Sequence, residues 1–133
     1  MAVMSPVMYT PGADLLTGAV QVRVPRGILK VLWGPAAGGD TATGILAAHF
    51  ADKSFAIEGT FGTSTVTVQG SNDSTNGTDG VWFGLVDPQG TAISKTANAI
   101  EQVLENPLWI RPTFGAGTGT ALNATLTCTT PRG

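Results

Sequence analysis

The sequence predicts an all-β protein, an antiparallel β-sandwich of the jelly-roll or immunoglobulin-like type with an extended N-terminal arm. Short stretches of alternating apolar and polar residues recur along the chain at intervals of about 8–12 residues, separated by Gly, Pro and Asn. The 133 residues include 18 Gly and 19 Thr, which suits turns and strands. Only 12% of the residues are charged whereas 42% are hydrophobic, so the chain is predicted to pack into one domain rather than to be disordered.

The first 18 residues differ from the rest, and we assign them to the arm, with residues 19–133 as the single sandwich domain. Pro6 and Pro11 hold their own backbone and that of the preceding residue in extended geometry. The segment is too apolar for a solvated tail, so its side chains would gain free energy by burial against a partner. The predicted contacts with the capsid or a neighbouring subunit are Val3, Met4, Val7, Met8, Tyr9, Leu15 and Leu16.

The domain begins with two predicted strands. Residues 20–24 alternate valine with polar residues, which predicts a half-buried strand that ends at the following Pro-Arg-Gly. Residues 28–33 form the next strand, ended by Gly34-Pro35. The pattern of residues 45–50 fits a helical turn or a strand equally well.

A hairpin is predicted over residues 55–69. Phe55, Ile57 and Phe61 share one face of a strand, and residues 65–69 alternate in the same way. Gly62 lies between the two stretches and is suited to a turn, so we expect the two strands to pair with each other.

A polar loop over residues 70–80 follows, and residues 81–86 form the next predicted strand. Residues 87–90 read Asp-Pro-Gln-Gly, which is turn chemistry because Pro stands at the second position and Gly at the fourth. A short strand at residues 91–94 would complete this hairpin.

The last third of the chain is predicted to close the sandwich. Residues 97–105 fit a helix or a strand, and Pro107 ends either one. Residues 108–111 form a strand capped by Pro112, which belongs at a sheet edge or strand end. A glycine-rich turn at residues 114–120 then leads to the closing strand, residues 121–129.

The composition offers little for catalysis, and we predict no enzyme, no cofactor and no metal site. His49 is the sole imidazole, and no nucleophile motif accompanies it. Glu101 and Glu105 would share a face only on a helix, where like charges four residues apart mark solvated surface. Cys128 alternates in phase with apolar neighbours, so we expect it to be a buried core residue.

Two features could bind ligands, and each has a simpler interpretation. The Asn and Asp residues of 72–80 could hold calcium, but Phe83 stands where an EF-hand needs Glu, and turn geometry explains the same residues. Trp33, Trp82 and Trp109 could stack on sugars, but each has aliphatic neighbours in a predicted strand, which favours core packing.

The net charge and the hydropathy of the chain argue against two classes of partner, nucleic acids and membranes. The net charge of −2 disfavours nucleic-acid binding through phosphate contacts. No apolar run is long enough for a transmembrane helix, and the first residues lack the basic start and apolar block of a secretory signal. We therefore expect neither nucleic acid nor membrane as a partner.

Several segments resemble a known family. They lie at residues 61–91, with Gly-Ser-Asn-Asp at 70–73 and Trp-Phe-Gly-Leu-Val-Asp-Pro-Gln-Gly-Thr at 82–91, and at 39–41, 51–54, 100–112 and 117–119. Together they make residues 33–127 similar to the small virion proteins of tailed bacteriophages that decorate or cement the capsid. The loop before Trp82 is longer here than in typical members, and the family supplies no catalytic residues.

The resemblance implies a capsid decoration protein that binds the outer surface of the shell of major capsid protein and stabilises it. We expect a homotrimer, because three attachment points raise the effective concentration at each site. An extended arm of 15 residues reaches up to about 50 Å, far enough to cross a neighbouring subunit. The alternative is a tail- or head-fibre-associated sandwich that binds host surface glycans, with exposed Trp and loop Asn and Asp side chains.

Overall fold

The computed structural model describes residues 3–4, 6–9, 14–17, 20–23, 28–48 and 50–129, and among these it contains strands and no helix. Five strands form one antiparallel sheet in the order β12 (Ala99–Gln102), β8 (Ala51–Thr60), β14 (Thr120–Thr129), β5 (Ile28–Ala36) and β2 (Val7–Tyr9). The second antiparallel sheet has the order β10 (Phe83–Gly84), β9 (Val66–Ser71), β13 (Trp109–Phe114) and β7 (Ile45–Leu46), with β11 (Ser94–Lys95) also paired to β9.

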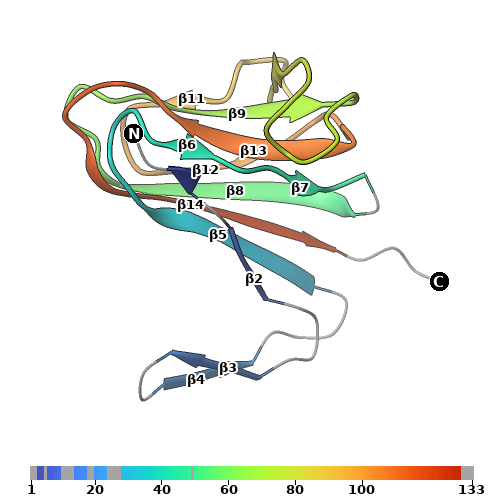
Figure 1. Ribbon diagram of the computed structural model, residues 1–133, viewed down its shortest axis with the longest axis horizontal. Coiled ribbons are helices and arrows are strands. Elements are labelled where there is room, and N and C mark those ends of the chain that lie inside the picture. The colour runs from blue at the N-terminus through green and yellow to red at the C-terminus, as the bar shows by residue number, and fades with distance from the viewer. Residues whose placement is uncertain are drawn as a thin grey trace.

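The two sheets face each other as two layers, an arrangement consistent with a β-sandwich (Figure 1). Alternate residues of each strand point into the space between them, as the period of two requires. Trp33 and Phe55 stack near the centre, with ring centroids 5.9 Å apart. The other buried residues of this core include Leu29, Val31, Ile57, Val66, Val68, Ile110, Phe114, Leu122, Ala124 and Leu126. The predicted all-β class is confirmed.

The predicted hairpin of residues 55–69 is wrong. β8 pairs with β12 and β14, whereas β9 pairs with β10, β11 and β13, so the two strands lie in opposite sheets. The turn between them crosses from one layer to the other, with the backbone N–H of Ser64 donating to the carbonyl of Phe61 at 2.7 Å. Phe61 and Ser64 are both buried, which ties this turn into the core. Alternation shows that a stretch is a strand but does not say which strand pairs with it.

The two segments with ambiguous patterns are both strands. β7 lies within residues 45–50, and β12 lies within residues 97–105. The strand predicted at 81–86 is reduced to β10 and a single bridge between Val86 and Ala92. The predicted turn at 87–90 is confirmed by the hydrogen bond from Gly90 N to Asp87 O, 2.9 Å long.

Two proline positions differ from expectation. Gly34-Pro35 does not end β5, which continues through a cis peptide bond to Ala36. Pro112 does not cap a strand at an edge, because it lies inside β13 opposite Val68 of β9. On its other side, β7 pairs only with Trp109 and Ile110, so no paired strand lies alongside Pro112 there. The missing N–H is therefore tolerated within the sheet.

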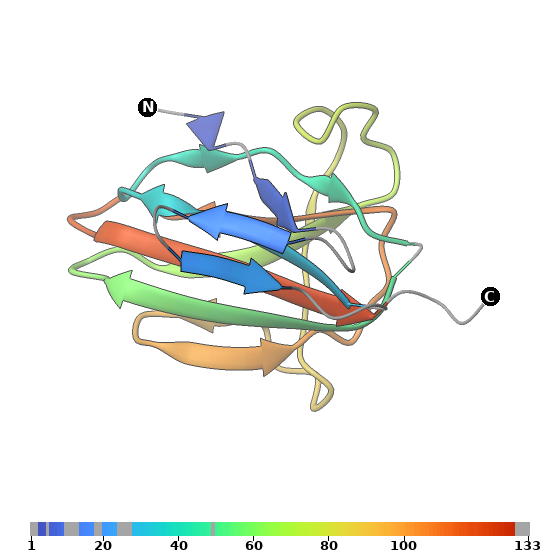
Figure 2. The ribbon, with the colours of Figure 1, turned by 90° about the horizontal axis from the view of Figure 1, so that it is seen from below.

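The N-terminal strands are attached in three different ways. β1 (Val3–Met4) pairs in parallel with β6 (Thr41–Ala42), and β2 pairs antiparallel with β5. β3 (Asp14–Thr17) and β4 (Val20–Arg23) form a two-stranded hairpin of their own, so the boundary drawn at residue 18 falls within this hairpin. Figures 1 and 2 place the hairpin beside the outer face of the five-stranded sheet.

Candidate functional site

The seven residues predicted to contact a partner lie in three of these N-terminal strands. Val7, Met8 and Tyr9 make up β2, the outermost strand of the five-stranded sheet, while Val3 and Met4 make up β1. Leu15 and Leu16 lie in β3, opposite Val22 and Gln21. The structure describes the backbone of these strands, and it does not bring the seven residues together on one sheet.

The register of the five-stranded sheet connects β2 to a continuous row of residues. Leu32 of β5 pairs with Val7 on one side and with Thr125 on the other, and Ala56 and Ile100 continue the row across β8 and β12. Residues directly opposite each other in antiparallel strands share a face. The described members of the row are uncharged and partly or fully exposed, and the row ends at the β2 edge. Lys30 and Glu58 line the same surface depression as Thr125, Ala56 and Ile100, beside the row.

The polar loop before Trp82 is held together by its own hydrogen bonds. The Asp79 carboxylate accepts from Ser74 Oγ at 2.8 Å and from the backbone N–H of Thr75 at 2.6 Å. Asp73 Oδ1 accepts from Ser71 Oγ at 2.9 Å and from the backbone N–H of Val81 at 2.8 Å. Both carboxylates thus accept hydrogen bonds from hydroxyl and backbone N–H groups of the loop.

These hydrogen bonds also set the charge state of the loop. Donation from the side chain and backbone of Thr75 holds the pKa of Asp79 well below its usual range, and donation from Val81 and Ser71 lowers the pKa of Asp73. Within the described part of the chain, no group of three or more His, Cys, Asp and Glu residues is arranged to hold a metal ion. Asp73 and Asp79 accept the hydrogen bonds that organise the loop.

The tryptophans have different environments. Trp33 is fully buried and confirms the predicted core role. Trp82 and Trp109 are half-buried, and the indole Nε1 of Trp82 donates to the carbonyl of Asp79 at 2.8 Å. The guanidinium of Arg111 lies 3.9 Å from the Trp82 ring centroid, a cation–π contact that occupies one ring face.

Glu101 and Glu105, the two carboxylates considered for catalysis, have separate partners. Lys95 Nζ lies 2.9 Å from Glu101 Oε1, whereas the Glu105 carboxylate accepts from the backbone N–H of Val86 at 2.9 and 3.2 Å. Burial raises the pKa of the Cys128 thiol to about 11, which keeps it protonated near neutral pH. His49 lies outside the described residues.

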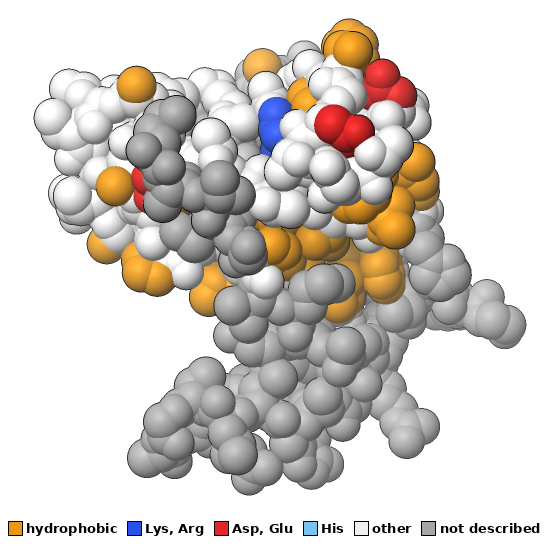
Figure 3. Space-filling model, in the orientation of Figure 1, with side chains coloured by type: hydrophobic (Ala, Val, Ile, Leu, Met, Phe, Trp, Pro, Cys, Tyr) orange, Lys and Arg blue, Asp and Glu red, His pale blue; other side chains and the backbone are white. Residues whose placement is uncertain are grey.

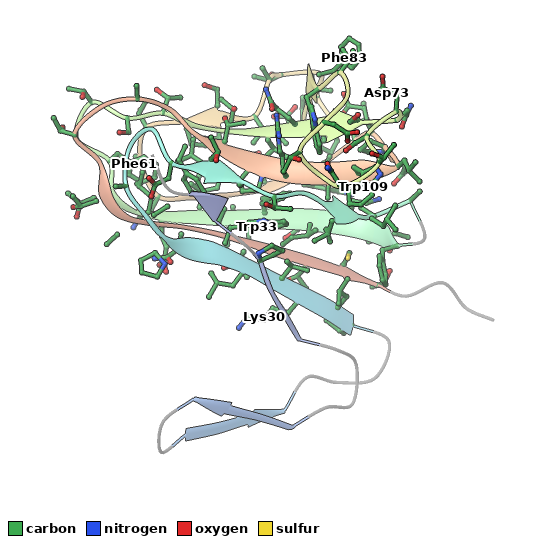
Figure 4. The ribbon with its side chains drawn as sticks, viewed as in Figure 1. Lys30, Trp33, Phe61, Asp73, Phe83 and Trp109 are labelled. Atoms are coloured by element: carbon green, nitrogen blue, oxygen red, sulfur yellow. The ribbon has the colours of Figure 1, made fainter. Side chains whose placement is uncertain are left out.

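Sequence reasoning missed a hollow of about 310 Å³ at the open edge between the sheets. Its apolar lining comes from Phe83, Leu85 and Pro107. Its polar side chains are Ser71, Asn72, Glu105 and Asn106, and the remaining lining is Gly70 and Gly84. Phe83 is 66% exposed and projects from the top of the molecule, at the end of the face where acidic side chains also lie (Figures 3 and 4).

The polar side chains of the hollow are fixed by structural hydrogen bonds. Asn72 Oδ1 accepts from the backbone N–H of Leu108 at 2.9 Å, and Asn106 Oδ1 accepts from Lys53 Nζ at 2.7 Å. Lys53 is only 1% exposed, and its ammonium also donates to the carbonyl of Phe50 at 2.8 Å. Desolvation by burial lowers the pKa of Lys53. Both asparagine oxygens are therefore engaged, and each amide retains an NH₂ group that can donate.

The one sequence signal for this hollow is the phase of residues 81–86. Alternation puts Phe83 and Leu85 on the same, inward face of a strand. Leu85 is buried as expected, but Phe83 lies at the sandwich edge, where the opposite layer does not cover it. The alternation predicts which face of the strand is inward. Only the three-dimensional structure shows how far the opposite sheet covers that face.

Comparisons with known proteins provide no family for the chain. No family model matches the sequence, and no curated protein is similar to it at a significant level. The described part of the chain contains no helix long and apolar enough to cross a membrane. The functional interpretation therefore depends on the residues and their geometry.

Proposed function

We propose that this protein is a structural subunit that decorates the outer surface of a tailed-phage capsid, binds the major capsid protein and stabilises the shell. The proposal includes a homotrimer, a jelly-roll or immunoglobulin-like sandwich and attachment through the N-terminal segment. It includes no catalytic step, cofactor or metal.

The observation that carries the proposal is the position of β2. This strand, which holds Val7, Met8 and Tyr9, ends the strand order of its sheet, so no described strand pairs with its outer edge. An unpaired edge offers a row of backbone N–H and C=O groups to a partner strand. Strand addition of this kind gives affinity through main-chain hydrogen bonds and needs no charged contact.

The surface beside this edge supports the same role. The row from Leu32 through Thr125 and Ala56 to Ile100 carries no charge, and Ile100 is 70% exposed. Surfaces buried in permanent assemblies are depleted in charged residues. An uncharged row that continues an open strand edge suits a subunit that stays attached to a larger structure.

The test is occupancy on expanded phage shells that lack a decoration protein. Val7→Lys places a charge on the β2 edge, which disfavours strand addition, and we expect it to abolish binding. Val7→Thr keeps a β-forming residue without charge and should still bind. Gln102→Lys puts the same charge on β12, the strand at the other end of the sheet, and is the matched control.

Circular dichroism and thermal melting must first show that all three variants are folded. Full occupancy by Val7→Lys, or equal loss with Gln102→Lys, would contradict the proposed role of β2. Sedimentation equilibrium of the free protein tests the trimer separately, so failure of the trimer and failure of the edge contact are distinguishable.

A further inference from the structure

The hollow beside Phe83 combines an aromatic ring with both hydrogen-bond donors and hydrogen-bond acceptors. Phe83, Leu85 and Pro107 provide its apolar surface, and Asn72 and Asn106 each retain an amide NH₂ donor. The Glu105 carboxylate accepts one backbone N–H and keeps further lone pairs. A ligand in the hollow can therefore accept hydrogen bonds from the amides, donate a hydrogen bond to Glu105 and stack on Phe83.

The backbone of Gly84 adds a further polar group. The backbone N–H of Leu85 donates to the carbonyl of Val68 in β9 at 2.9 Å, whereas its carbonyl accepts from the N–H of Ile93 at 3.0 Å, so the N–H of Leu85 is directed towards β9. In an antiparallel strand, neighbouring residues direct their backbone groups to opposite sides. Gly84 therefore directs its N–H and C=O away from β9, and β10 is the end strand of its sheet.

We propose that this hollow binds one pyranose ring of a glycan. A pyranose has C–H groups that pack on an aromatic ring and hydroxyls that both donate and accept hydrogen bonds. These groups match Phe83 on one side and the asparagine amides with Glu105 on the other. The volume of about 310 Å³ is at the small end of ligand sites, which suits a single ring.

Other ligand classes fit less well. An anion would meet the negative charge of Glu105 and would find neither Lys nor Arg in the lining. A divalent cation would find a single carboxylate there, and calcium requires six to eight oxygen ligands. A peptide strand would find only the two residues of β10 to pair with. A neutral polyhydroxylated ring remains the best chemical match.

Apart from Asn72, the residues that the sequence suggested for glycan binding do not line this hollow. Asp73 and Asp79 cap loop donors, Trp33 is buried, and one face of Trp82 is covered by Arg111. The strand residues that line the hollow belong to β9 and β10, in the sheet opposite to the one that contains β2. Glycan binding at Phe83 and shell binding at β2 can therefore succeed or fail independently.

The experiment is an NMR titration of the full chain with methyl glycosides of glucose, galactose, mannose, rhamnose and N-acetylglucosamine. We expect at least one glycoside to bind with a millimolar dissociation constant, as a single ring with few contacts should. The shifts should concentrate on the Gly84 amide, the Phe83 ring and the side-chain NH₂ groups of Asn72 and Asn106.

Two variants test the assignment, each with a matched control. Phe83→Ala removes the platform and should weaken binding at least about tenfold, whereas Ile100→Ala removes a similarly exposed side chain from the other sheet. Asn72→Asp keeps the oxygen that accepts from Leu108 but removes the NH₂ donor, and it should weaken binding several-fold. Asn98→Asp is its control, because Asn98 Oδ1 likewise accepts a backbone N–H, from Gly59.

The controls should bind as the unmodified protein does, and their amide spectra show whether each variant is folded. The proposal is overturned if none of the five glycosides shifts the signals of the hollow. It is also overturned if binding occurs but Phe83→Ala and Ile100→Ala bind equally well.

Discussion

The indole Nε1 of Trp33 donates a 2.7 Å hydrogen bond to the backbone carbonyl of Thr43. Ile45 pairs with Ile110, so the same register would place Thr43 opposite Pro112. The N–H of Ala47 donates to Leu108 O at 2.7 Å. In an antiparallel ladder every second residue directs its backbone groups towards the partner strand, so Thr43, like Ala47, directs its carbonyl towards β13. A side chain of the opposite sheet thus supplies the donor that Pro112 lacks.

This contact predicts a large effect of Trp33→Phe. The substitution keeps an aromatic ring in the core but leaves the Thr43 carbonyl without its donor, which costs about 1–3 kcal/mol of unfolding free energy beyond the loss of ring volume. Urea denaturation measures the change. Trp109→Phe, at a half-buried position, is the control.

The same contact can be tested by rescue. Pro112→Ala restores a backbone N–H at the position facing Thr43, so the double variant should recover part of the stability lost in Trp33→Phe. Strictly additive losses in the two single variants and the double variant would show that the two donors do not serve the same carbonyl.

The turn between β8 and β9 predicts that Ser64→Ala is destabilising. Ser64 is fully buried, and its Oγ accepts the backbone N–H of Gly119 at 2.9 Å. Removal of the hydroxyl leaves that N–H unpaired, with an expected loss of about 1–3 kcal/mol in unfolding free energy. Ser94→Ala changes an exposed serine and should lose much less; equal losses in both variants would rule out the proposed role of Ser64.

The raised pKa of the Cys128 thiol leads us to expect a lower free energy of unfolding at alkaline pH. Burial raises the thiol pKa from 9.0 to about 11, so between these values the thiol is protonated in the folded protein and ionised in the unfolded chain. The folded state then binds more protons, and the unfolding free energy falls as pH rises from 9 to 11.

The control for this prediction is Cys128→Ala. Lys53, whose pKa is lowered by burial, contributes a slope of opposite sign, and its charge interacts with the Cys128 thiolate, so the difference between the two proteins measures the thiol together with this interaction. Parallel stability curves over this pH range would show that the thiol does not carry the effect.

The lowered pKa of Asp79 leads us to expect that the polar loop loses stability in acid. Its pKa is held below the ordinary value of 3.8, so its contribution to stability is complete above that pH and is lost as pH falls through the folded-state pKa. Asp79→Asn should melt at a lower temperature than the unmodified protein at neutral pH, and the difference should shrink in strong acid. Identical melting at neutral pH would contradict the capping role.

Much of the fold follows from the sequence because alternation is a local property. Residues 121–129 alternate, whereas residues 28–33 form a nearly continuous apolar run, and both became long strands with buried alternate positions. Cys128, in phase with them, is buried as predicted. For such stretches the hydrophobic effect alone selects the inward face.

Strand pairing and the candidate sites do not follow from local pattern. Gly62 is compatible with a hairpin turn and equally with the observed crossing between sheets, since the choice depends on distant partners such as β13 and β14. The hollow requires Asn72 and Asn106, which are far apart in the chain and meet only after folding. The partner of the β2 edge is likewise outside what this sequence specifies by itself.

The most direct test of the central claim is a reconstruction of an intact phage particle that carries this protein. The account predicts that a partner strand lies along the outer edge of β2 on the external surface of the shell. A particle without the protein, or one in which Val7–Tyr9 faces solvent while another surface makes the contact, would contradict it.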